Sequence, residues 1–201
     1  MITLIDYGAG NLTSVRKALS ALGAVVDTPQ SPAECARASG VIVPGVGNFA
    51  ATAALEGEWR EAIASAVNAG TPLLGICLGM QWLFEGSDEA PEVRGLGLMR
   101  GRITRLRGIA ADRVKVPHVG WNALDTSARP SRLLNGLSPG AQVYFTHSYA
   151  APVTDDCIAA TTHADPFASA VERGNIFGVQ FHPEKSSDAG LQVLRNFLAV
   201  C

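Results

Sequence analysis

Residues 72–81 read Pro-Leu-Leu-Gly-Ile-Cys-Leu-Gly-Met-Gln, an apolar run in which two glycines bracket a cysteine. Gly75 and Gly79 flank Cys77 with the spacing of a nucleophile elbow, a sharp turn between a strand and a helix. The nucleophile of such a turn is strained, and its neighbours must be small because other chain segments pass close by. Cys77 would begin a helix from Leu78 to about Phe84, whose free N–H groups favour a thiolate. The stretch therefore predicts a strand, a turn that presents a reactive cysteine, and a helix.

Cys77 also has a simpler interpretation, that of a buried structural cysteine. Free cysteine is among the most buried residue types, and most cysteines behave as small hydrophobic residues. The two flanking glycines at the end of an apolar strand favour the elbow over this alternative.

Outward from this stretch, strands and helices alternate along the first half of the chain. Strands are expected at residues 2–5, 24–27, 41–43 and 73–76, and helices at residues 12–22, 59–67 and 78–84. Such alternation with short loops predicts a parallel sheet with helices on both faces. The second half looks extended at residues 97–106 and 114–116 and has strands at residues 143–145, 158–162, 169–173 and 176–181. A hairpin is expected at Gly174-Asn175, and a last helix capped at Ser187-Asp188. We therefore expect an α/β fold in one domain, residues 1–201, with antiparallel strands added to the parallel part.

Composition excludes several classes of protein. The chain has 201 residues, 47% hydrophobic and 17% charged, as is ordinary for a globular domain. Its net charge of −2 gives no electrostatic reason to expect a nucleic acid or an anionic membrane as a partner. No apolar run approaches the roughly 20 residues of a membrane span. The first residues read as a strand and not as a signal peptide, and the four cysteines lack a CxxC spacing, so we expect reduced thiols in a cytoplasmic protein.

Three glycine-rich loops leave the predicted parallel strands at residues 7–11, 44–48 and 75–79. Most loop glycines only allow tight turns. These three, however, would lie at the carboxyl edge of one sheet, which is where open α/β sheets bind ligands. We therefore expect the functional site at this edge.

A cysteine nucleophile needs a base, and the base needs a group that orients it. His182 follows the predicted strand at residues 176–181, and Pro183 biases it toward an extended conformation. Residues two apart in extended chain point the same way, so Glu184 would share a face with His182 and hold its imidazole. A lone histidine at a strand end often only caps a turn, but with the elbow present Cys77, His182 and Glu184 form a triad by role.

Acyl chemistry also needs donors for a developing oxyanion. The loop at residues 44–47 carries Gly45, Val46 and Gly47, whose backbone N–H groups can turn toward a negative charge. The N–H of Leu78, directly after the nucleophile, is the expected second donor. The alternative for this loop is an ordinary turn.

Residues 75–81 together with Phe-His-Pro-Glu-Lys-Ser at residues 181–186 resemble the class I (triad) glutamine amidotransferases. Further blocks resemble, within that family, the glutaminase subunits of imidazole glycerol phosphate synthase. They are Tyr-Gly-Ala-Gly-Asn at 7–11, Pro-Gly-Val-Gly-Asn-Phe at 44–49, Pro-His-Val-Gly-Trp-Asn at 117–122 and Tyr-Phe-Thr-His-Ser-Tyr at 144–149. The blocks span nearly the whole chain.

The resemblance implies a flavodoxin-like three-layer sandwich with a mixed, mostly parallel central sheet. It implies that glutamine is hydrolysed to glutamate and ammonia through a thioester on Cys77. The ammonia would pass to a separate (β/α)₈-barrel cyclase subunit, which forms imidazole glycerol phosphate and an aminoimidazole carboxamide ribotide in histidine biosynthesis. No metal and no organic cofactor are implied.

The resemblance also assigns residues around the substrate and the partner. Gln81 and Glu89 match positions that hold the α-amino and α-carboxylate end of glutamine, and His147, Ser148 and Tyr149 match a strand that closes the pocket. Glu89 also lies in an acidic loop that could be a solvated face. Residues expected at the carboxyl edge, facing the partner and the ammonia passage, are Asn11, Trp121, Tyr144 and Lys185. Trp121 and Tyr144 could equally be core aromatics, and Lys185 a solvated turn cation.

Other functions stay open at this point. The chain could serve another synthase, such as one forming pyridoxal phosphate or anthranilate. It could be a catalytically idle module that only binds and regulates a partner, although the presence of Cys77, His182 and Glu184 disfavours this. It could also be a cysteine peptidase or γ-glutamyl hydrolase, for which 201 residues leave little room.

Overall fold

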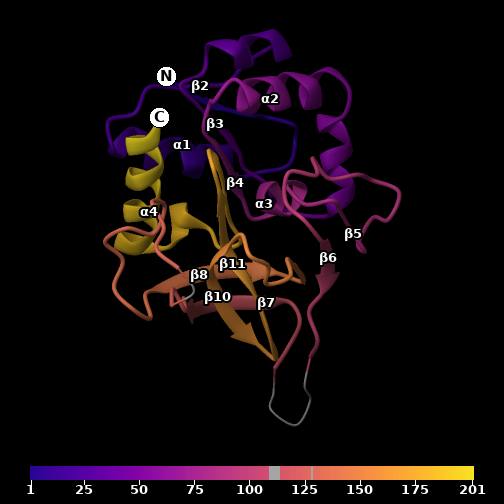
Figure 1. Ribbon diagram of the computed structural model, residues 1–201, viewed down its shortest axis with the longest axis vertical. Coiled ribbons are helices and arrows are strands. Elements are labelled where there is room, and N and C mark those ends of the chain that lie inside the picture. The colour runs from indigo at the N-terminus through magenta and orange to yellow at the C-terminus, as the bar shows by residue number, and fades with distance from the viewer. Residues whose placement is uncertain (109–113, 128) are drawn as a thin grey trace.

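The computed structural model describes residues 1–108, 114–127 and 129–201. A seven-stranded sheet runs through the centre of the molecule (Figure 1). Its spatial order is β10 (Cys157–His163), β11 (Asp165–Arg173), β12 (Ile176–Val179), β4 (Leu73–Ile76), β3 (Gly40–Val43), β1 (Ile2–Leu4) and β2 (Val26–Asp27). The strands from β12 to β2 are parallel, and β10 and β11 add antiparallel pairs at one edge. The predicted division of the α/β sheet is confirmed.

Helices cover both faces of this sheet because its strands are apolar on both sides. Ile42 and Leu74 pack toward α1 (Leu12–Ala21) and α4 (Ser187–Val200), whereas Val41 and Leu73 pack toward the opposite face. That opposite face is covered by α2 (Glu58–Asn68), α3 (Leu78–Trp82) and the 3₁₀ helix η1 (Pro32–Arg37). Figure 1 shows α4 on one side of the sheet and α2 and α3 on the other. The result is a three-layer sandwich.

Two smaller sheets complete the second half of the chain. One contains β5 (Gly86–Ser87), β6 (Arg102–Arg105) and β9 (Tyr149–Ala150), and the other pairs β7 (His118–Ala123) with β8 (Gln142–His147). Two 3₁₀ helices, η2 (Phe49–Leu55) and η3 (Pro183–Lys185), follow the carboxyl ends of β3 and β12. The sequence analysis did not predict β5, β7 or η2. The strand β7 contains Gly120 and Asn122, residues that are depleted in strands, so its pairing with β8 decides its conformation.

Helix boundaries differ from expectation at two places. The helix α3 ends at Trp82 and not at Phe84, because the N–H groups of Leu83 and Phe84 bond three residues back in a tighter turn. The last helix begins at Ser187, but its N-cap is Ser186. The Ser186 hydroxyl donates to the carbonyl oxygen of His182 and accepts from the N–H of Tyr144, which ties the helix start to β8.

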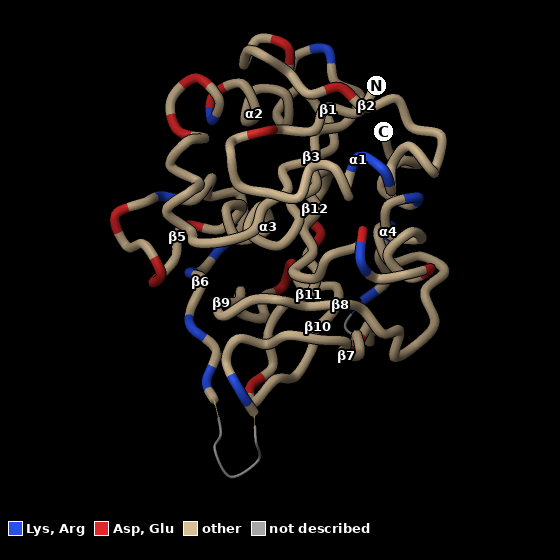
Figure 2. Tube along the Cα trace, turned by 180° about the vertical axis from the view of Figure 1, so that it is seen from behind, with Lys and Arg blue, Asp and Glu red and all other residues tan. Residues whose placement is uncertain are grey.

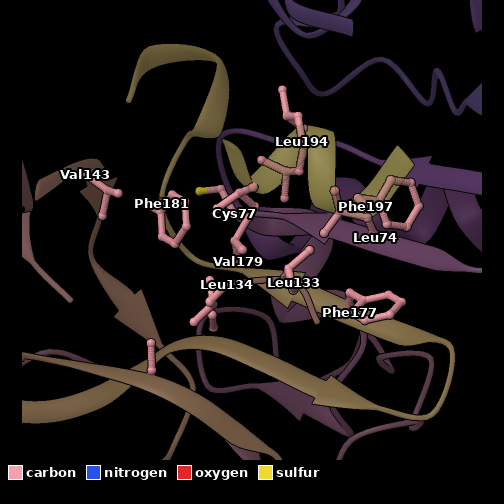
Figure 3. Packing of buried hydrophobic residues seen from close by; sticks show 14 of the residues in the cluster. Leu74, Cys77, Leu133, Leu134, Val143, Phe177, Val179, Phe181, Leu194 and Phe197 are labelled. Atoms are coloured by element: carbon pink, nitrogen blue, oxygen red, sulfur yellow. The ribbon is translucent and has the colours of Figure 1, made fainter. Parts of the chain in front are cut away.

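Cys77 borders the larger hydrophobic core. Figure 3 shows Cys77 among the side chains of Val179, Phe181 and Leu194, and these residues belong to one cluster of buried apolar residues. Phe181 and Leu194 are completely buried. The backbone around Cys77 is therefore held by packing from β12 and α4.

Charges are spread over the surface (Figure 2). Arg102 and Arg105 of β6 and Arg107 after it form a basic segment, but Arg102 pairs with Asp88 at 3.0 Å and Arg107 pairs with Asp165. None of the helices in the described ranges is long and apolar enough to cross a membrane.

Candidate active site

Cys77 occupies the strained turn that the sequence predicts. It is the residue before α3, with φ of 52° and ψ of −107°, a left-handed conformation that is unusual for a residue other than glycine. Both flanking positions have room only for glycine. A Cβ on Gly75 would lie 2.5 Å from the carbonyl oxygen of Gly79, and a Cβ on Gly79 would overlap the carbonyl oxygen of Val43. The elbow geometry is thus built by close backbone passage.

The parallel register of β12 beside β4 brings the histidine to the cysteine. Val179 pairs with Ile76, and the N–H of Cys77 donates to the carbonyl oxygen of Val179 at 2.7 Å. Chain leaving β12 therefore passes Cys77 before it reaches His182. This pairing joins residues about a hundred positions apart and explains how one edge of the sheet collects the site.

His182 and Glu184 form a buried pair. Nδ1 of His182 lies 2.9 Å from Oε1 of Glu184, and their side chains are 2% and 1% exposed. The contact is as predicted, but the backbone reason was wrong. His182 is extended, whereas Glu184 lies in the 3₁₀ helix η3, so a tight turn and not a continuing strand aims the carboxylate at the ring.

The surroundings of His182 stabilise its charged form. Burial lowers its pKa, but the neighbouring Cys77 and Glu184 together outweigh burial and raise the pKa to about 10. Glu184 can only accept when ionised, so Nδ1 carries a proton toward it. Nε2 is buried and has no hydrogen-bond partner of good geometry among the described residues. That nitrogen can exchange a proton with a group at Cys77.

A cavity of 240 Å³ opens beside Cys77. Gly47 and Leu78 line it with Cys77, and so do all the predicted substrate-binding residues: Gln81, Glu89, His147, Ser148 and Tyr149. A larger cavity of 660 Å³, next to Asn122 and Thr162, contains none of these residues. We assign the candidate site to the smaller cavity because Cys77 lines it.

Glu89 is anchored and is not part of a solvated face. Its Oε2 accepts a hydrogen bond of 2.7 Å from the N–H of Phe49, the first residue of η2. The acidic loop is therefore folded back over the cavity, and a carboxylate contributes to its wall.

The oxyanion loop differs from expectation at one donor. The N–H of Leu78 is not free, because it donates to the carbonyl oxygen of Gly45 at 3.3 Å. Gly45 is confined between the Tyr7 hydroxyl and the Leu78 side chain. Gly47 has φ of +103° and open space around its Cα, and Val46 is 37% exposed. In this conformation the loop supplies an acceptor where the sequence predicts donors.

The contact of His147 with a second histidine, His118, was not predicted. His147 Nδ1 lies 2.9 Å from the carbonyl oxygen of Tyr149, and its Nε2 lies 3.1 Å from His118 Nδ1. Burial and the neighbouring His163 lower the pKa of His118 to about 4, and mainly burial lowers that of His147 to about 3. Because the Tyr149 carbonyl only accepts, His147 must donate from Nδ1 and accept at Nε2. Both rings are neutral supports of the cavity wall.

Gln180 was also missed. It is completely buried, and its Nε2 lies 3.5 Å from Cys77 Sγ. A signal existed in the sequence, because Gln180 stands two residues before His182 at the end of a predicted strand and so shares its face.

The predicted partner-facing residues fall into two groups. Trp121 and Tyr144 are paired across β7 and β8, with ring centroids 6.2 Å apart, and Lys185 Nζ lies 5.9 Å from the Tyr144 ring centroid. Trp121 is 53% exposed, so it is not a core aromatic. Asn11 instead caps α1, accepting the N–H of Ser14 on its side-chain oxygen. The described residues contain no group of three or more His, Cys, Asp or Glu side chains placed to hold a metal ion.

This fold and this site define a class of protein. The family model described as "Glutamine amidotransferase class-I" matches residues 3–201, and the chain belongs to the class I glutamine amidotransferases. Solved structures agree on the fold. A crystal structure titled as a glutamine amidotransferase has a TM-score of 0.75 at 20% identity, covering 100% of this chain and 98% of that one. PurLQS from Thermotoga maritima has a TM-score of 0.75 at 18% identity, covering 98% of this chain and 97% of that one.

Similar curated proteins identify the group within this family to which the chain belongs. The chain is 48% identical to the imidazole glycerol phosphate synthase subunit HisH of Moorella thermoacetica, over 98% of this chain and 93% of that protein. It is 46% identical to the same subunit of Deinococcus radiodurans, over 98% of this chain and 92% of that protein. Within the amidotransferases the chain therefore belongs to the HisH subunits of imidazole glycerol phosphate synthase.

Proposed function

We propose that this chain hydrolyses glutamine at Cys77 and supplies the ammonia to a cyclase subunit of imidazole glycerol phosphate synthase. The observation that carries the proposal is the strained Cys77, placed by the β4–β12 register beside the buried His182–Glu184 pair and opening into a cavity. Membership of the HisH subunits supports the choice of synthase over the pyridoxal phosphate and anthranilate alternatives.

The cavity suits the polar end of glutamine. Glu89 offers a carboxylate for the α-ammonium group, and Gln81 lines the same wall. Ser148 and Tyr149 close the cavity from the β8–β9 segment. With this end held, the γ-carboxamide would reach Cys77. Binding at one end and reaction at the other fixes the near-attack geometry.

The chemistry then follows from the pair of charges at Cys77 and His182. The thiolate attacks the carbon of the γ-carboxamide, and the carboxamide oxygen becomes an oxyanion. His182, held protonated by Glu184, gives its Nε2 proton to the departing nitrogen, so the C–N bond breaks and ammonia leaves. His182 next takes a proton from water, which attacks the thioester, and glutamate is released with the thiolate restored.

A barrel-shaped (β/α)₈ cyclase would dock on the face formed by β7, β8 and η3. This face carries Trp121, Tyr144 and Lys185, and Val119 on β7 is 58% exposed beside them. Val46 of the oxyanion loop is also exposed, so a docked partner could touch the loop directly. The cyclase would use the ammonia to form imidazole glycerol phosphate and an aminoimidazole carboxamide ribotide.

We further propose that the chain is one domain and acts in the cytoplasm. Its helices on both faces share one sheet. Its four cysteines are unpaired, which suits a reducing compartment.

The variant Cys77→Ala tests the function in the complex with purified cyclase. It should lose glutamine-dependent synthesis and keep ammonia-dependent synthesis, because ammonia from solution does not need Cys77. Glutamate release and imidazole glycerol phosphate formation are measured side by side. Retained glutaminase activity in this variant would contradict the assignment of Cys77 as the nucleophile. Loss of synthesis with both nitrogen sources would point to a disturbed complex.

A further inference from the structure

The buried side chain of Gln180 connects the nucleophile to the wall of the substrate cavity. Its Nε2 lies 3.5 Å from Cys77 Sγ. Its Oε1 accepts a hydrogen bond from Gln81 Nε2 at 3.0 Å. Gln81 lines the cavity, whereas Gln180 does not. Gln180, which lies behind the cavity wall, therefore contacts both Cys77 and the predicted substrate-binding residue Gln81.

A backbone carbonyl sets the direction of these hydrogen bonds. Tyr149 O can only accept, so Gln81 turns its amino group toward it, at 2.9 Å. The same amino group also donates to Gln180, which accepts this hydrogen bond through its Oε1. This leaves the amino group of Gln180 facing Cys77 Sγ. The orientation of both amides follows from one fixed acceptor.

Two consequences follow for the site. Both N–H bonds of Gln81 are used inside the protein, so the amide oxygen is the polar atom that Gln81 has left for the cavity. An oxygen beside the Glu89 carboxylate suits an ammonium group, whereas an NH₂ would repel it. The sulfur of Cys77, in turn, faces an N–H donor that favours its thiolate form.

We propose that Gln180 is a positioning residue that orients Gln81 toward the ammonium group of the substrate and supports the thiolate of Cys77. The proposal rests on the function proposed above. Gln180 itself touches no substrate. It acts through two neighbours, and each of its two polar atoms has a separate task.

The test uses Gln180→Met and Gln180→Glu in the complex with the cyclase, and Gln142→Met as a matched control. Methionine is of similar length but removes both hydrogen bonds, whereas glutamate keeps an acceptor for Gln81 and loses the donor to sulfur. Gln142 is an exposed residue on β8. Circular dichroism and thermal unfolding establish that each variant folds.

Steady-state glutamine hydrolysis separates the two tasks. Gln180→Met should raise KM and lower kcat, each by about 10- to 100-fold, the usual effect of losing a hydrogen bond to a charged group. Gln180→Glu should lower kcat to a similar degree and leave KM within a few-fold of the wild type. Gln142→Met should match the wild type. An equal rise in KM for both Gln180 variants would overturn the orienting role toward Gln81.

Alkylation of Cys77 by iodoacetamide tests the thiolate role without using glutamine. Gln180→Met and Gln180→Glu should slow the labelling of Cys77 about tenfold at pH 7, while Cys35, Cys157 and Cys201 serve as internal references. Unchanged labelling would overturn this role. If the wild type labels in this Gln180-dependent way but releases no glutamate with its partner, the proposed function and the orienting role toward Gln81 fail, and the role of Gln180 toward the Cys77 thiolate stands.

Discussion

The N–H of Leu78 donates a hydrogen bond to the carbonyl oxygen of Gly45 at 3.3 Å. Leu78 directly follows the nucleophile, so its N–H is the donor that the developing oxyanion would use. Here it is occupied by the very loop that should add a second donor. The peptides between Gly45 and Gly47 must turn before both donors can face the substrate. In this conformation the side chains of the candidate site are in place, but the backbone N–H groups that would stabilise the oxyanion do not yet face the substrate.

We therefore expect the isolated chain to hydrolyse glutamine slowly. Adding the cyclase and its nucleotide ligand should raise kcat by about 10²–10³, the effect of restoring one oxyanion donor. Glutamate release is measured with the chain alone, with the cyclase, and with the cyclase and its ligand. Full activity in the isolated chain would mean that the loop needs no rearrangement.

Gly47→Ala should block this rearrangement. Gly47 has φ of +103° with no atoms crowding its Cα, and Gly23 has φ of +80° in equally open space after α1. Alanine at either position should lower the free energy of unfolding by about 1–2 kcal/mol, because a Cβ disfavours positive φ. Only Gly47→Ala should also reduce activation by the partner, about tenfold or more. Equal activation of the two variants would contradict a role for the loop.

Glu184→Gln should disable the base without removing it. The carboxylate is one of the interactions that raise the pKa of His182 to about 10, so its loss lowers that pKa. The imidazolium that protonates the departing nitrogen is then lost at lower pH, and the alkaline limb of the kcat profile moves down. We expect kcat to fall by about 10²–10⁴. Glu58→Gln, an exposed position on α2, is the control and should leave the profile unchanged.

Lys185→Ala should weaken coupling to the cyclase more than folding. Lys185 is exposed, and its ammonium group lies over the Tyr144 ring next to Trp121. We expect the dissociation constant of the complex to rise severalfold, with thermal unfolding of the isolated chain unchanged. Lys17→Ala, exposed on α1, should alter neither quantity. Titration calorimetry with purified cyclase measures the difference, and equal affinities for the two variants would remove Lys185 from the interface.

The buried histidines should make the protein sensitive to acid. The pKa values of His118 and His147 are lowered to about 4 and about 3, whereas an unfolded histidine titrates near 6.5. The unfolded state therefore binds more protons as pH falls below 6.5, and the free energy of unfolding should drop by up to about 1.4 kcal/mol per pH unit for each histidine. His182 opposes this slope above about pH 6, because its pKa of about 10 keeps it protonated in the folded state while the unfolded histidine still takes up protons. Well below that pH it is protonated in both states and adds no slope.

Urea unfolding from about pH 6 down to pH 5 measures this slope, because His182 contributes little there. His118→Asn should remove the share of one histidine and flatten the curve. A wild-type curve that is already flat between about pH 6 and pH 5 would show that these histidines take up protons in the folded state.

Some parts of the site were readable from sequence because they depend on neighbouring residues. The elbow at Cys77 and the His182–Glu184 pair are set by local spacing, and both are found. The backbone conformation that forms the pair nevertheless differs, since the sequence pattern predicts an extended segment where η3 makes a turn. His182 and Glu184 are only two residues apart, so their side chains meet in either conformation, and the elbow is fixed by the space around its glycines.

Other parts depend on which segments meet. Gln180 meets Cys77 only because β12 lies parallel to β4 in a particular register, and His147 meets His118 only because β7 pairs with β8. The occupied N–H of Leu78 likewise depends on how the loop at residues 44–47 packs over α3. No local pattern encodes these hydrogen bonds, because each joins groups that are distant in the chain.

The amino-acid sequence by itself determined the α/β fold and the strained turn at Cys77, and it placed Glu184 close to His182, since hydrophobic periodicity and glycine sterics act over a few residues. The tertiary structure alone decided which way the amides of Gln81 and Gln180 point and that the oxyanion donor at Leu78 is occupied. The physical reason is that the direction of a hydrogen bond depends on the acceptors nearby. Those acceptors, the carbonyl oxygens of Tyr149 and Gly45, come from segments that only folding brings together.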